Sequence, residues 1–154
     1  MSWQSLLNPD IQEFVHTHEK DDVAALALKT PPTADWDYKL ILDQIKSRQK
    51  AQRKIPLWLT HHKNIIFPPP DLLEQASSAA TARYKAGLIQ GKTFVDLTGG
   101  CGVDTCAFTE HFTSGYCIEK DKSAADLLAH NLPLLSPTPV EVINTSAENF
   151  IKTM

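Results

Sequence analysis

The chain has 154 residues, enough for one ordinary domain core or for a partial domain with an appendage. Its 15 basic and 18 acidic residues leave a net charge of −3, so the composition gives no basic signal for nucleic acid or for an anionic membrane. No apolar run approaches the ~20 residues that a membrane-spanning helix needs. The three cysteines lack metal-ligand spacing and favour a reducing, cytoplasmic setting.

The first part of the chain has the periodicity of amphipathic helices. Asp21 and Asp22 precede the second of these helices, and Pro31-Pro32 follows it, as expected for a helix start and a helix end. A longer helix is expected to begin near Asp35. The apolar residues that recur at helical spacing are Ile11, Phe14 and Val15, then Val23, Leu26 and Ala27, and finally Tyr38, Ile41, Leu42 and Ile45.

From Lys46 to Lys54 the apolar stripe of this long helix stops, and only Ala51 is apolar. A helix that is polar all round predicts a segment that projects into solvent or meets a partner. Its basic residues suit RNA phosphates, and they equally suit a solvated helix end, where cations interact favourably with the helix dipole. Trp58 is predicted to anchor this helical part on its neighbour.

Pro68-Pro69-Pro70 predicts a domain boundary, because three prolines exclude both helix and central strand. The sequence therefore predicts a helical N-terminal domain over residues 1–69 and a second domain over residues 70–154. Asp71 and Glu74 resemble a capping box at the start of the next helix. That helix is expected to present one face to the sheet, formed by Leu73, Ala76, Ala80 and Tyr84.

A short apolar run, Phe94-Val95, ends in Asp96, and a glycine-rich turn with Gly99, Gly100 and Gly102 follows. Because the sequence then becomes helix-compatible, the order is strand, tight turn and helix start. Glycine permits positive φ and lets a ligand approach the backbone, while the helix behind offers unpaired N–H groups. The alternative is a loop that merely turns tightly.

Glu119 closes the next apolar run, Tyr116-Cys117-Ile118, and lies 23 residues after Asp96 (119 − 96). This span suits a turn, a helix and a second short strand. Both acids would then flank the carboxyl edge of a parallel sheet, where open α/β folds bind their ligands. The pattern is that of a nucleotide-like cofactor site.

A dinucleotide site needs a third glycine after Gly100 and Gly102, and Thr105 occupies that position. An acid such as Asp96 just before the turn would also repel a pyrophosphate. These two features favour a ligand with a cationic part, and S-adenosylmethionine carries an ammonium, a sulfonium and a ribose diol. An oxidoreductase fragment that binds a nicotinamide dinucleotide remains the alternative cofactor reading.

Val95, Asp96, Gly100 and Gly102 fit the first motif of class I S-adenosylmethionine-dependent methyltransferases, which the sequence resembles over about residues 77 to 150. The likeness is greatest to the branch of trimethylguanosine synthases and RNA guanine methyltransferases. The resemblance implies an α/β fold: an N-terminal helical domain followed by a partial Rossmann-like methyltransferase domain with the first three parallel strands and their helices. It also implies RNA as the methyl acceptor.

The resemblance assigns cofactor-binding roles and no catalytic acid or base. Asp96 would lie near the methionine end of the cofactor, and Glu119 would accept hydrogen bonds from the ribose hydroxyls. The glycine loop, with Thr98, Gly99, Gly100 and Gly102, would leave room for the methionyl and ribose parts. No metal site is expected, because the paired histidines lack nearby carboxylates or thiols.

Val140 to Ile143 fits the third strand, and Ser146-Ala147 falls where the family contacts adenine. In this family the helix before the first strand often closes over the methionine end of the cofactor. Candidates for that contact are Ser77, Ser78 and Thr81.

The sequence stops at Met154, shortly after the predicted third strand. In the related RNA-modifying enzymes the fourth strand ends in an Asn/Asp-Pro-Pro loop that holds the acceptor, and no such motif occurs here. The chain is therefore predicted to be an N-terminal part of a larger methyltransferase, inactive alone. The alternatives are a small protein that completes its sheet by self-association through the open edge, and a non-catalytic helical interaction module.

Overall fold

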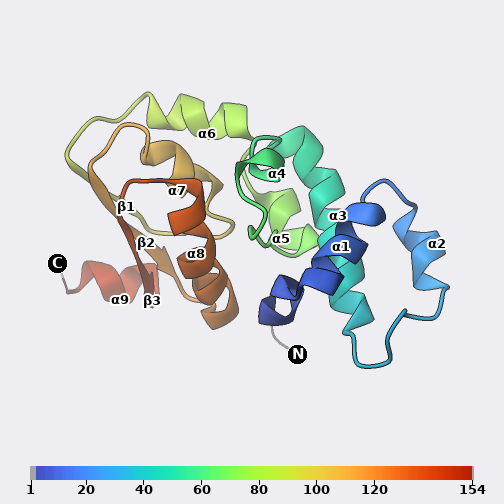
Figure 1. The fold of residues 1–154 in the computed structure, drawn as a ribbon. Helices are drawn as coiled ribbons and strands as arrows, with labels where there is room; N and C mark the ends of the chain where they lie inside the picture. Colours follow the sequence, from blue (N-terminus) through green and yellow to red (C-terminus); the bar gives the residue numbers. More distant parts are fainter. Residues whose placement is uncertain (1–2, 154) are drawn as a thin grey trace.

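The computed structural model describes residues 3–153, and it is drawn in Figure 1. A 3-10 helix and four α-helices form the first part of the chain, and a three-stranded sheet with helices forms the last part (Figure 1). The elements of the first part are the 3-10 helix Trp3–Leu7, α1 (Pro9–Thr17), α2 (Val23–Ala27), α3 (Tyr38–Lys54) and α4 (Trp58–His61).

The predicted helices of the first part are confirmed, and capping side chains set where they begin. The Asp22 carboxylate accepts from Ala24 N at 2.8 Å, and the Asp37 carboxylate accepts from Leu40 N at 3.1 Å. Each of these acids satisfies a backbone N–H that has no partner within its helix. Ile41 and Ile45 point into an apolar cluster with Leu6, Ile11 and other residues of the first part.

Two short helices, α5 (Pro70–Gln75) and α6 (Ala79–Ala86), connect the helical part to the sheet. They replace the single helix that the sequence predicted after Asp71. Ala76 is extended (ψ 156°), and the Ser78 hydroxyl starts a new helix by accepting from Thr81 N at 3.1 Å. The predicted apolar face is therefore wrong, and Tyr84 is 70% exposed. The capping box is also wrong, because Pro70 itself begins α5.

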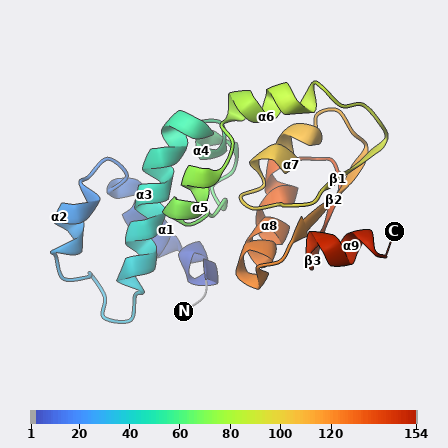
Figure 2. The same cartoon turned by 180° about the vertical axis from the view of Figure 1, so that it is seen from behind.

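The sheet is parallel, with the order β1-β2-β3, as the sequence predicted. Its strands are β1 (Thr93–Asp96), β2 (Ser114–Glu119) and β3 (Val140–Asn144). The connecting helices are α7 (Val103–Phe108), α8 (Lys122–Leu135) and, after β3, α9 (Ala147–Ile151). Figure 2 shows α7 and α8 between the sheet and the helical part, with α9 on the outer side. Right-handed crossovers place α7 and α8 on one face of the sheet.

The second half of α3 does not project into solvent, so that prediction is wrong. Ser47, Arg48 and Ala51 are buried. The Arg48 guanidinium lies 5.2 Å from the Phe67 ring centroid and 3.3 Å from the Glu19 carboxylate. The helix is polar because it packs against irregular backbone, which needs hydrogen-bonding partners when it is buried.

Residues 66–68 form a buried connecting strap between α3 and α8. The Gln44 amide donates to Phe67 O at 3.0 Å and accepts from Phe67 N at 2.8 Å. From the other side, the Asn131 amide accepts from Ile66 N at 3.1 Å and donates to Ile66 O at 2.7 Å. The strap therefore joins the helical part to the sheet-bearing part.

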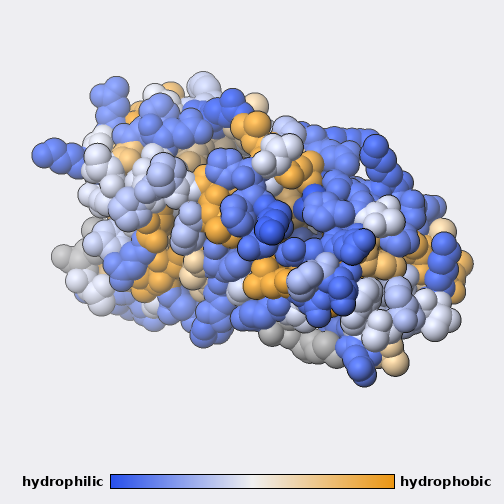
Figure 3. All heavy atoms as spheres, viewed as in Figure 1, coloured by the Kyte–Doolittle hydropathy of each residue, from blue (hydrophilic) through white to orange (hydrophobic). Residues whose placement is uncertain are grey.

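Apolar packing also crosses the predicted boundary at Pro68–Pro70. One cluster combines Ala51, Ile55 and Trp58 with Val103 and Ala107 of α7. Trp58 is 8% exposed, which confirms its predicted anchoring role. Figure 3 shows a mostly hydrophilic face with apolar atoms in its middle, where the two parts meet. Within residues 3–153, no helix has both the length and the apolar character needed to cross a bilayer.

Candidate cofactor site at the glycine loop

Asp96 and Glu119 end two neighbouring strands and reach the same edge of the sheet. Asp96 pairs in register with Cys117, so Glu119 lies two residues further along β2. Because β1 and β2 are parallel, their carboxyl ends meet at one edge. The loop from Leu97 to Gly102 leaves β1 at this edge, between the two acids.

Asp96 is buried and holds the loop from beneath. One carboxylate oxygen accepts from Thr98 N at 3.1 Å, and the other accepts from the Thr105 hydroxyl at 2.6 Å. Thr105 is fully buried, at the position where a dinucleotide fingerprint has its third glycine. The carboxylate therefore stabilises the turn, and its contact with a cofactor stays a prediction.

The turn itself depends on two glycines in the left-handed region. Gly100 has φ +53° and Gly102 has φ +80°, a conformation that costs other residues about 1–2 kcal/mol. Among residues 3–153 these are the positive-φ positions. Gly102 N donates to Gly99 O at 2.7 Å and closes the turn. The side-chain-free backbone of the loop consequently faces the cleft beside it.

Glu119 grips the loop from the adjacent strand. Its Oε2 accepts from Gly100 N at 2.8 Å, and its Oε1 accepts from Asp121 N at 2.9 Å. The residue is half-buried. Because a carboxylate has about four acceptor positions, roughly two remain open for a ligand that donates a pair of hydrogen bonds.

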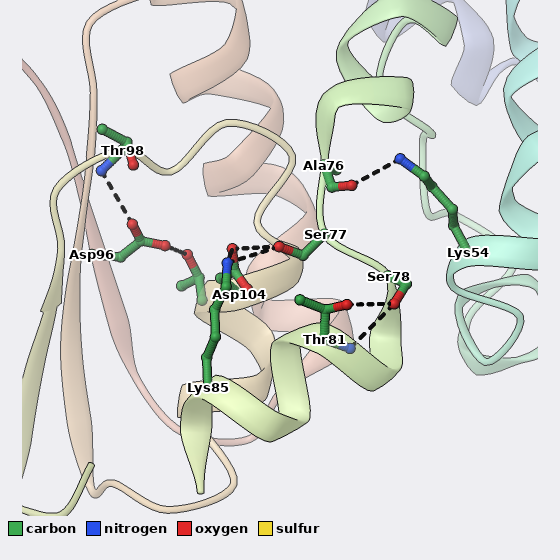
Figure 4. A network of polar contacts seen from close by, with 10 residues as sticks. Lys54, Ala76, Ser77, Ser78, Thr81, Lys85, Asp96, Thr98 and Asp104 are labelled. Carbon is green, nitrogen blue, oxygen red and sulfur yellow. Dashed lines mark hydrogen bonds and ion pairs between the residues drawn. The ribbon is translucent and has the colours of Figure 1, made fainter. Parts of the chain in front are cut away.

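A cavity of about 310 Å³ lies against the loop, and Thr98, Gly99 and Gly100 line it together with side chains from α5, α6 and α7. Figure 4 shows Lys85, Ser77 and Asp104 meeting beside this loop. Of the residues assigned from the sequence to the methionine end, Ser77 lies in this cavity, whereas Ser78 and Thr81 hydrogen-bond each other at the start of α6. Gln75, Lys85 and Asp104 also line it, and the sequence analysis missed them. Asp104 was detectable, since it follows the glycine turn directly.

The positions assigned to adenine recognition lie at the end of β3. The Ser146 hydroxyl accepts from Asn149 N at 3.2 Å and so caps α9, and Ala147 is the first residue of that helix. Hydrogen bonding by Ser146 and Glu148's own backbone lowers the pKa of the exposed Glu148 carboxyl. Contact of Ser146 or Ala147 with adenine stays a prediction.

The cysteines near the loop are chemically quiet. Burial raises the pKa of the Cys101, Cys106 and Cys117 thiols to about 12. The thiolate, which is the nucleophile, is therefore suppressed at neutral pH. The residues that the structure describes contain no cluster of three or more His, Cys, Asp or Glu side chains able to hold a metal ion.

Comparison with known proteins gives a structural match and no sequence family. No family model matches the chain. No curated protein matches it either. An inferred methyltransferase from Porphyromonas gingivalis W83 superposes with a TM-score of 0.80 and 24% identity, over 99% of this chain and 38% of that one. An inferred RNA methyltransferase from Pyrococcus horikoshii gives a TM-score of 0.35 and 22% identity, over 84% of this chain and 52% of that one.

The first of these matches shows a shared fold. The chain has the α/β architecture of a partial Rossmann-like methyltransferase domain behind an N-terminal helical part, as predicted. It spans 38% of the length of the Porphyromonas protein.

Proposed function

We propose that this chain is the S-adenosylmethionine-binding part of a methyltransferase. The observation that carries the proposal is the contact of Glu119 Oε2 with Gly100 N at 2.8 Å. It brings a partly exposed carboxylate from β2 onto the glycine loop from β1. A ribose with two free hydroxyls beside this loop would donate to the remaining acceptor positions of Glu119.

The charges around the loop support a cationic ligand rather than a pyrophosphate. Asp96, Asp104 and Glu119 supply three carboxylates, and Lys85 is the cation among the residues that line the described cavity. S-adenosylmethionine carries a sulfonium and an ammonium against one carboxylate, so its net charge is complementary. A nicotinamide dinucleotide would bring its phosphates close to Asp96, which is unfavourable.

The chemistry supplied by this cofactor is methyl transfer from a sulfonium to a nucleophile, without a need for a general acid or base in this part. The residues described would hold and orient the cofactor, which is where proximity and alignment contribute to the rate. Membership of the trimethylguanosine synthase branch belongs to the same proposal, and it rests on Val95, Asp96, Gly100 and Gly102.

The test is calorimetric titration of S-adenosylhomocysteine, the demethylated cofactor, into wild type and Glu119→Ala. Loss of a charge-assisted pair should cost about 1.5–3 kcal/mol, a weakening of about 10- to 150-fold. Glu141→Ala is the matched control, because it removes an exposed carboxylate from the neighbouring strand. Equal affinities of wild type and Glu119→Ala would refute the assignment of Glu119.

We further propose RNA as the methyl acceptor, on the family resemblance and on the basic residues of α3. Lys50 and Lys54 bond the α5 segment and Arg48 is buried, so Lys46 and Arg53 are the exposed cations of this stretch. RNA binding should weaken in a Lys46→Ala/Arg53→Ala double variant, measured at low salt. An unchanged affinity would remove these residues from the proposal.

The open edge of β1 supports a proposal of self-association. Within residues 3–153, β1 pairs with β2 alone, which leaves one row of its backbone groups without a strand partner. Pairing with a second copy would satisfy those groups. Light scattering would then give a mass above that of one chain, and a single-chain mass at all concentrations would refute the pairing.

A further inference from the structure

The polar wall of the cavity is a closed three-residue network that joins two elements (Figure 4). The Lys85 ammonium of α6 donates to Asp104 Oδ2 at 2.9 Å and to Ser77 Oγ at 2.9 Å. Ser77 in turn donates to the same Asp104 oxygen at 3.0 Å. A cation, an anion and a hydroxyl thus lie together beside Thr98, Gly99 and Gly100.

The network leaves the Asp104 carboxylate unevenly satisfied. Oδ2 accepts two hydrogen bonds, whereas Oδ1 is buried and has no hydrogen-bond partner. An unpaired buried charge-bearing oxygen is costly, and such groups call for an explanation. A small rotation of the Asp104 side chain would offer both oxygens to a donor in the cavity.

Stability of the fold does not account for the ion pair. The Lys85 and Asp104 side chains are 46% and 30% exposed, and pairs of this kind contribute little to stability in water. The position of Ser77, by contrast, is fixed by the helical part. Lys54 of α3 donates to the carbonyl oxygens of Leu73 at 3.0 Å and Ala76 at 2.8 Å, and also to that of Glu74. Ser77 follows directly and is held at the mouth of the cavity.

We propose that Lys85, Ser77 and Asp104 form the recognition site for the α-amino-acid end of the cofactor. An amino-acid end carries an ammonium and a carboxylate on one carbon. Asp104 would accept from the ammonium, while Lys85 and Ser77 would donate to the carboxylate. In the structure without ligand, the Lys85–Asp104 pair takes the place of these two charges. The proposal rests on the proposed function, because it assigns the other end of the same ligand.

The test compares two nucleosides that differ only at that end. S-adenosylhomocysteine has the amino-acid group, and 5′-methylthioadenosine lacks it. Lys85→Ala in the full chain should weaken S-adenosylhomocysteine by about tenfold or more, since charge-assisted hydrogen bonds to the carboxylate are lost. It should leave the affinity for 5′-methylthioadenosine unchanged. Glu119→Ala should weaken both nucleosides, because both carry the ribose.

Lys39→Ala is the matched control, since it removes an exposed lysine–aspartate pair on α3. Thermal unfolding without ligand checks that each variant is folded. Equal weakening of both nucleosides by Lys85→Ala, or no weakening of either, would overturn this inference while the proposed function stands. Failure of wild type to bind either nucleoside would overturn both.

Discussion

Asn131→Ala is expected to lower the free energy of unfolding by about 2–4 kcal/mol, because it leaves two buried backbone groups of the strap without partners. Asn131 is 2% exposed and makes both hydrogen bonds of Ile66, at 3.1 Å to the N–H and 2.7 Å to the carbonyl. Each unsatisfied buried group costs about 1–3 kcal/mol. Urea unfolding followed by circular dichroism measures the loss.

Asn149→Ala provides the control for this substitution, since Asn149 is an exposed asparagine on α9. Its effect should stay within about 0.5 kcal/mol, as for most surface positions. A loss at Asn131 no larger than that at Asn149 would show that the strap is not held by this amide.

Gly99→Ala is the second large expected effect, a loss of about 2 kcal/mol or more of unfolding free energy from overpacking. A Cβ at this position would lie 2.5 Å from Cys117 Sγ and 2.9 Å from Leu128 Cδ1. Neither neighbour has room to move, because both are buried, at 0% and 3% exposure. At this chain length the melting temperature should fall by about 4–8 °C.

Gly87→Ala is the control, and the sign of its effect should be opposite. Gly87 has helical dihedral angles (φ −68°, ψ −13°), and a Cβ there would meet no atom closer than 3.5 Å. Alanine at a compatible position stabilises by about 0.4–1 kcal/mol, by restricting the unfolded chain. A Gly99→Ala protein as stable as wild type would mean that the loop does not pack against β2 and α8 as described.

The sheet and its loop were predictable because their signals are local. The apolar runs that end in Asp96 and Glu119 became adjacent parallel strands, and the glycines between them took the left-handed turn. Helix starts were predictable for the same reason, since an acid such as Asp22 caps a helix that begins immediately after it. In each case the residues that determine the structure are neighbours in sequence.

The errors arose where a polar residue serves a distant backbone. Gln44, Ser47 and Lys54 make α3 polar because they bond residues 19 to 23 positions away. From the sequence, this pattern cannot be distinguished from a solvated face. Lys85 was missed for the same reason, as its partner Asp104 lies on another helix, 19 residues later. Asp104 itself lay next to the glycine motif and was overlooked.

The most direct test of the central claim is the affinity of wild type for S-adenosylhomocysteine compared with that for NAD⁺. If the carboxylates of Asp96, Asp104 and Glu119 surround a site for an S-adenosyl nucleoside, calorimetry should show one site for S-adenosylhomocysteine and no binding of NAD⁺. Tighter binding of NAD⁺, or no binding of either ligand, would contradict the account.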